Sequence, residues 1–154
     1  MNTTLLGLAL VVGAPNLKDE PKKAPEIVGQ WVVEKMSVGG KEGGKLGTEM
    51  VYEFTADGKW LIKRDGVLNK TPPREIRYDT KAKPATVDVI YTTSAPGKGG
   101  IGGISRDMHG IYKVEGDTLT ICLSPSGGER PTKFDSDQGT PVMLMTLTRV
   151  KKDK

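Results

Sequence analysis

Apolar and polar residues alternate along most of the chain from residue 27 onward, a period of two that is typical of half-buried β-strands. In 50–54, Met50, Tyr52 and Phe54 share one face, and in 59–64 Trp60 and Ile62 do the same. The same alternation recurs around 31–34 and in 74–79, 87–91, 110–114, 118–123 and 142–150. The pattern therefore predicts about eight strands and no long amphipathic helix.

Short turn signals separate these runs. Asp57-Gly58 favours a type I′ hairpin, because both positions of that turn have positive φ. Asp65-Gly66 and Glu115-Gly116-Asp117 are further turn signals. Sequential antiparallel strands joined in this way predict an all-β, up-and-down barrel that closes on itself, with a two-sheet β-sandwich as the alternative.

Composition limits the chemistry that is open to the chain. Its 154 residues suit one domain, with 20 glycines and 10 prolines favouring turns over helices. Cys122 is the sole cysteine and His109 the sole histidine, so an intrachain disulfide, a multi-cysteine zinc site and a histidine-rich metal site are excluded. We expect no metal site and no cofactor. The sequence also lacks an apolar stretch of the length of a transmembrane helix.

The two ends of the chain differ from its body. Residues 1–14 contain the apolar run 5–12 followed by small residues, which indicates a signal peptide and an exported protein, periplasmic or extracellular. Residues 15–26 are rich in proline and lysine and are typical of a linker. The predicted barrel domain spans 27–150, and 151–154 form a basic tail.

Gly29-Gln30-Trp31, at the start of the first strand, resembles the Gly-x-Trp motif that opens lipocalin-type barrels. The resemblance implies that Trp31 closes one end of the barrel and that an arginine from late in the chain lies over its ring. Arg149 is the candidate for this cation–π partner. Gly29, Trp31 and Arg149 are therefore the predicted barrel-closure residues.

A broader resemblance covers almost the whole predicted domain. The chain resembles an uncharacterised lipocalin-like domain family that is expanded in planctomycete bacteria. Besides residues 29–31, it is carried by the segments 54–59, 110–119, 121–122 and 130–134. This resemblance implies a lipocalin-like barrel and an envelope or secreted location. It implies no activity.

Two glycine- or aspartate-rich segments match ligand motifs only formally. Residues 97–102 fit G-x-G-x-x-G, but a strand follows where dinucleotide binding needs a helix, so a flexible connection is expected. Residues 135–139 begin like a calcium loop but lack its closing glutamate, which favours a polar turn.

We predict no catalytic residue. His109 precedes the predicted strand 110–114 near the barrel rim, and Ser94, Ser105 and Ser124 lie in no recognisable nucleophile motif. Basic residues such as Arg74 are scattered, and the eight aromatic residues are expected on inward faces. Nucleic-acid binding is therefore not expected, since it would need outward aromatic side chains among the basic ones.

Strand parity predicts a set of large side chains that point into the barrel and could contact a small apolar molecule. They are Tyr52, Phe54, Trp60, Ile62, Tyr91, Tyr112, Met143 and Met145. The same residues could instead fill the core, because an eight-stranded barrel can do either. The leading hypothesis is a non-enzymatic, exported binding module with a small apolar ligand inside or at the rim. The alternative is a structural or interaction domain of the cell envelope with a filled barrel and an unknown protein partner. A hydrolase is the least favoured hypothesis.

Overall fold

The computed structural model describes residues 25–43, 49–70, 72–91, 107–125, 127–137 and 139–151. The predicted leader 1–14, most of the linker 15–26, the glycine-rich motif 97–102 and residues 152–154 of the tail lie outside the described residues. Ser94 and Ser105 do so as well.

Ten strands and no helix are present in the described ranges. They are β1 (Gly29–Val38), β2 (Lys41–Glu42), β3 (Met50–Phe54), β4 (Lys59–Arg64), β5 (Val67–Leu68), β6 (Arg74–Asp79), β7 (Ala85–Ile90), β8 (Met108–Glu115), β9 (Thr118–Ser124) and β10 (Met143–Arg149). The sequence pattern placed the eight longer ones correctly and missed the two-residue strands β2 and β5.

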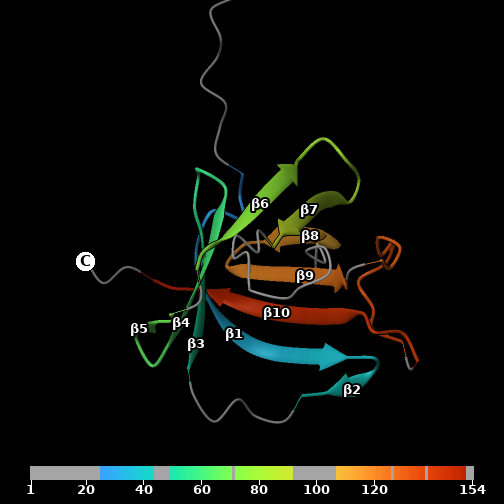
Figure 1. Ribbon diagram of the computed structural model, residues 1–154, viewed down its shortest axis with the longest axis horizontal. Coiled ribbons are helices and arrows are strands. Elements are labelled where there is room, and N and C mark those ends of the chain that lie inside the picture. The colour runs from blue at the N-terminus through green and yellow to red at the C-terminus, as the bar shows by residue number, and fades with distance from the viewer. Residues whose placement is uncertain are drawn as a thin grey trace, which may run out of the picture.

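These strands form a closed antiparallel barrel (Figure 1). The order is β1-β3-β4-β6-β7-β8-β9-β10, and β10 pairs with β1 from Trp31↔Arg149 to Val38↔Met143. β2 and β5 are additions that pair with β1 and β4. Closure between β10 and β1 confirms the predicted up-and-down barrel and excludes the two-sheet sandwich.

Antiparallel pairing defines two ends of the barrel. β1, β4, β7 and β9 run in one direction, and β3, β6, β8 and β10 run in the other. The starts of β6 and β10 and the ends of β4 and β7 therefore lie at one end, which we call the Arg74 end. The starts of β1 and β4 and the end of β10 lie at the opposite end, which we call the Trp31 end.

The interior is filled by side chains from alternate positions of the strands, as expected for a sheet with one face turned inward. Trp31, Leu119, Met145 and Leu147 have no exposed surface. Seventeen apolar residues form this buried cluster in the described part of the chain. The parity of the strands therefore located the core correctly.

Residues 125–142, which connect β9 to β10, cover part of the outer surface; we call them the strap, of which 126 and 138 are not described (Figure 1). The Cys122 thiol donates to Asp135 O over 3.3 Å, and the hydroxyl groups of Ser37 and Ser136 lie 2.7 Å apart. Cys122 and its cross-strand neighbour Ile111 point outward, yet both are buried. The strap thus covers the outward-facing Cys122.

The turns correct one detail of the sequence interpretation. At Asp57-Gly58, Gly58 has φ of +78° but Asp57 does not have a positive φ, so the predicted type I′ turn is wrong there. At Asp65-Gly66 both residues have positive φ, 49° and 75°, and this pair joins β4 to β5. Both φ signs match those of a type I′ turn at this second Asp-Gly pair.

Candidate ligand-binding end of the barrel

All eight predicted interior residues face the barrel core. Five of them are buried: Tyr52, Phe54, Trp60, Tyr112 and Met145. The other three, Ile62, Tyr91 and Met143, are partly buried and pack against the core. The partly exposed three belong to the Arg74 end, because they lie at or near the ends of β4 and β7 and the start of β10. Met36, near the end of β1, is partly buried in the same way.

Aromatic rings fill the middle of the barrel beside β3 and β4. The ring centroids of Tyr52 and Trp60 are 4.8 Å apart, and those of Phe54 and Trp60 are 5.7 Å apart. Tyr52 and Phe54 meet edge to face at 6.4 Å. Such contacts stabilise a packed interior beyond the burial of area. The middle of the barrel is therefore core.

At the Trp31 end, Arg149 lies over the Trp31 ring, the contact that the Gly-x-Trp resemblance implies. The guanidinium carbon of Arg149 lies 4.1 Å from the centroid of the Trp31 ring. Trp31 Nε1 donates to Ile27 O over 2.8 Å, and the Arg149 Nη atoms donate to Glu26 O and Val28 O over 3.1 and 3.4 Å. Gly29 has φ of +140°, and a Cβ there would lie 3.1 Å from Arg149 Nη1. Both polar side chains of this pair are thus hydrogen-bonded.

A second arginine–tryptophan contact lies toward the Arg74 end, and the sequence interpretation missed it. Arg74 has the same parity on β6 as the buried Ile76, so its side chain points into the barrel. Its guanidinium carbon lies 4.8 Å from the Trp60 centroid and 4.4 Å from the Tyr91 centroid. The alternation of Arg74, Ile76 and Tyr78 is the signal for this orientation, and the prediction that Arg74 is one of the scattered basic residues overlooks it.

Two polar atoms of this second contact are not satisfied. Trp60 Nε1 and Arg74 Nε are buried and have no hydrogen-bond partner among the described residues. No carboxylate forms an ion pair with Arg74 in that part of the chain, whereas Arg77, Arg130 and Arg149 each have one within 4.0 Å. Buried donors without a partner are rare in folded proteins, so each calls for a physical explanation.

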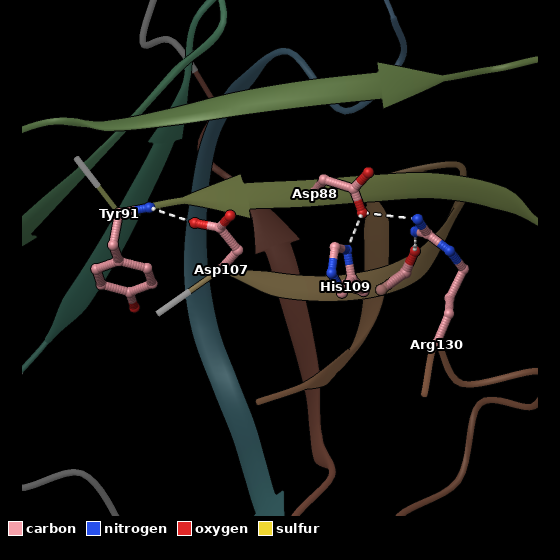
Figure 2. A network of polar contacts seen from close by, with 6 residues as sticks. Asp88, Tyr91, Asp107, His109 and Arg130 are labelled. Atoms are coloured by element: carbon pink, nitrogen blue, oxygen red, sulfur yellow. Dashed lines mark hydrogen bonds and ion pairs between the residues drawn. The ribbon is translucent and has the colours of Figure 1, made fainter. Parts of the chain in front are cut away.

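Two arginine side chains bring positive charge close to the Tyr52 phenol inside the barrel. Burial raises the pKa of the Tyr52 phenol above its usual value, while the nearby guanidinium groups of Arg74 and Arg64 act in the opposite direction. Arg64 ends β4 and therefore belongs to the Arg74 end. The acidic residue Asp107 at this end accepts the backbone N–H of Tyr91 over 3.2 Å (Figure 2).

Two recesses lie at the Trp31 end. One, of about 490 Å³, has walls from Pro25 and Glu26, the β6–β7 turn and Tyr112–Val114 of β8. The other, of about 790 Å³, lies outside β1 beside Glu53 and Arg149. Of the eight predicted interior residues, Tyr112 alone lines the first recess and none lines the second. Neither recess is lined by a buried donor that lacks a partner in the described chain.

His109 belongs to a polar network on the outer face of the barrel, shown in Figure 2. Its Nδ1 is 3.0 Å from Asp88 Oδ1, and Arg130 Nη2 is 2.8 Å from the same oxygen. Arg130 Nη1 also donates to Gly110 O over 2.7 Å. Arg130 comes from the strap, so the network fastens the strap to β7 and β8.

This network does not have the geometry of a catalytic triad. The prediction that His109 precedes its strand was wrong: β8 begins at Met108, and His109 lies within the strand. Ser124 is the cross-strand neighbour of His109, but no hydrogen bond joins their side chains in the described structure, and Ser124 is buried. Neither recess is lined by His109 or Asp88. The arrangement holds the strap against β7 and β8.

Two further outer residues complete the picture. Burial raises the pKa of the Cys122 thiol, which disfavours the reactive thiolate. Phe134 of the strap contacts the Lys113 ammonium at 5.4 Å from its ring centroid, so the expectation that all aromatic residues face inward was wrong for Phe134.

Comparison of the chain with protein-family models, curated proteins and solved structures yielded no match. In the ranges that the structure describes, no helix has the length and apolar character needed to cross a membrane.

Proposed function

We propose that the chain is a non-enzymatic binding module that takes a small, largely apolar molecule at the Arg74 end of its barrel. The observation that carries this proposal is that Met36, Ile62, Tyr91 and Met143 retain exposed surface at the end that also holds the unpartnered donors of Arg74 and Trp60. Tyr78, Ala85 and Val114 at the Trp31 end are partly buried as well, so burial alone does not distinguish the two ends. Methionine and aromatic side chains suit such a site because they adapt to apolar ligands of different shape.

The second candidate is a structural or interaction domain of the cell envelope with a filled barrel. The ring contacts among Tyr52, Phe54 and Trp60 favour it, because they occupy the middle of the interior. The two candidates differ in what the Arg74 end does. A binding module leaves room there for a ligand, and a filled barrel does not.

Titration with the neutral fluorescent probe N-phenyl-1-naphthylamine tests the proposal. We expect saturable binding, weakened several-fold by Ile62→Gln because a polar group at the contact is desolvated without a partner. Val114→Gln is the matched control, since Val114 is a partly buried interior residue on β8 near the Trp31 end. Absence of probe binding would support the filled barrel. Loss of binding in Val114→Gln alone would move the site to the recess at the Trp31 end.

Export is part of the same proposal and rests on the apolar run in residues 5–12. Sequencing the N-terminus of the protein purified from its own cells tests it. A mature chain that begins beyond residue 14 supports export, and one that begins at Met1 or Asn2 contradicts a cleaved leader.

A further inference from the structure

The buried donors of Arg74 and Trp60 carry an inference about the chemistry of the ligand. Arg74 Nε and Trp60 Nε1 are buried and unpartnered within the described residues, although their side chains are in contact. The rings of Trp60 and Tyr91 attract the guanidinium through their faces, but a ring face offers no oxygen to an N–H group. Neither donor therefore reaches an acceptor among the described residues.

We propose that the Arg74 end recognises its ligand by a carboxylate group, so that the ligand is a monocarboxylate with an apolar body. This inference rests on the proposed function of the same end of the barrel. A guanidinium presents N–H donors in one plane and matches the two oxygens of a carboxylate, and an indole N–H adds a neutral donor.

The charge balance selects one negative charge rather than two. Arg74 contacts two aromatic rings and packs among apolar side chains, where an uncompensated charge is costly. A single carboxylate neutralises Arg74, whereas a phosphate dianion would leave one charge without a close partner. Arg64, on the exposed end of β4, contributes attraction at longer range.

The apolar part of the ligand follows from the neighbouring side chains. Ile62, Met143 and Met36 are partly exposed at the same end and offer no charged group. Asp107 accepts the backbone N–H of Tyr91, and Asp65, beside the end of β4, accepts the backbone N–H of Glu49. None of these three acidic residues forms an ion pair with Arg74 in the described structure. A hydrocarbon chain can therefore extend from the bound carboxylate along Ile62, Met143 and Met36, none of which carries a charge.

Isothermal titration calorimetry with octanoate and with 1-octanol separates this inference from the proposed function. We expect octanoate to bind more tightly than octanol to the unaltered protein. Arg74→Gln should weaken octanoate binding about tenfold to a hundredfold, because it removes a charged hydrogen-bond donor. It should change octanol binding less than threefold. Arg77→Gln is the matched control, since Arg77 points outward from the same strand with 71% of its side chain exposed.

A second variant keeps the inference testable if Arg74→Gln does not fold. Trp60→Phe keeps an aromatic ring under Arg74 and removes the indole donor, and it should weaken octanoate binding about fivefold with little change for octanol. Equal binding of octanoate and octanol, unchanged in Arg74→Gln and Trp60→Phe, would overturn carboxylate recognition and leave the binding module intact. If neither compound binds, both carboxylate recognition and the binding module are contradicted, and the filled barrel is favoured.

Discussion

Two contacts between an arginine and a tryptophan occur in one barrel, and they differ in their hydrogen bonds. At the Trp31 end, Arg149 and Trp31 donate to Glu26 O, Val28 O and Ile27 O. In the second contact, Arg74 Nε and Trp60 Nε1 have no acceptor in the described part of the chain. The stacking distances are similar, 4.1 and 4.8 Å, so stacking alone does not distinguish structure from function. The hydrogen bonds do distinguish the two contacts, because they show which arginine–tryptophan pair finds all its acceptors within the protein.

The largest expected difference between the two contacts comes from the tryptophans. Trp31→Phe should lower the free energy of unfolding by about 2–4 kcal/mol, because it leaves a small void and removes the donor to the buried Ile27 carbonyl. Trp60→Phe should cost about 1 kcal/mol, because it leaves a void but removes no hydrogen bond within the described protein. Urea unfolding of both variants measures the difference, and equal losses would contradict the distinction.

The arginines provide the next comparison. Arg149→Met should destabilise the protein by about 2 kcal/mol, since two backbone carbonyls and the cation–π contact lose their cation. Arg74→Met should change stability by less than about 1 kcal/mol, because the lost cation–π contact is offset by removal of an unsatisfied buried donor. Thermal and urea unfolding check both. A loss in Arg74→Met as large as that in Arg149→Met would show that Arg74 is structural.

Tyr78 sharpens the comparison with a smaller effect, because its buried hydroxyl also lacks a partner among the described residues. Burial raises the pKa of the Tyr78 phenol, so the unfolded chain ionises first, near its usual value of about 10. The raised pKa of Tyr78 therefore costs no stability below pH 10. Above pH 10 the free energy of unfolding falls, because the unfolded chain then releases a proton that the folded protein keeps.

Tyr78→Phe should therefore leave stability at pH 7 unchanged or raised by less than about 1 kcal/mol. Between pH 10 and 11.5 the variant should lose about 1 kcal/mol less than the unaltered protein. Urea unfolding over this range is the measurement. The slope will not vanish, since burial also raises the pKa of Tyr52 and Tyr112. A pH profile that does not differ between the two proteins would count against burial of the Tyr78 hydroxyl.

Much of the barrel could be predicted because strand parity is a local signal. The alternation around Tyr52, Trp60 and Met145 placed these side chains inside correctly, and the Gly-x-Trp resemblance led to the contact of Arg149 with Trp31. The same parity applied to Arg74 would have placed it inside as well. A charged residue is usually expected at the surface, yet a guanidinium can be buried against aromatic rings.

Other features depend on contacts that are distant in sequence. The burial of Cys122 outside the barrel requires the strap. The contact of His109 with Asp88 requires the register of β7 and β8, and the contact of Arg130 with the same carboxylate requires the strap. The choice of the type I′ φ signs at Asp65-Gly66 instead of Asp57-Gly58 depends on loop length, since Thr55 and Lys59 bracket a longer turn. A single sequence carries no local signal for such contacts.

The two tryptophans also report directly on the central claim, that the Arg74 end is the site where a ligand supplies the missing acceptor. The measurement is the pair of indole N–H resonances in a ¹H–¹⁵N correlation spectrum, assigned with Trp60→Phe, during titration with octanoate. We expect the Trp60 resonance to shift progressively while that of Trp31, whose N–H is held by Ile27 O, stays in place. A titration in which the Trp60 resonance stays in place, or in which only Trp31 responds, would contradict the account.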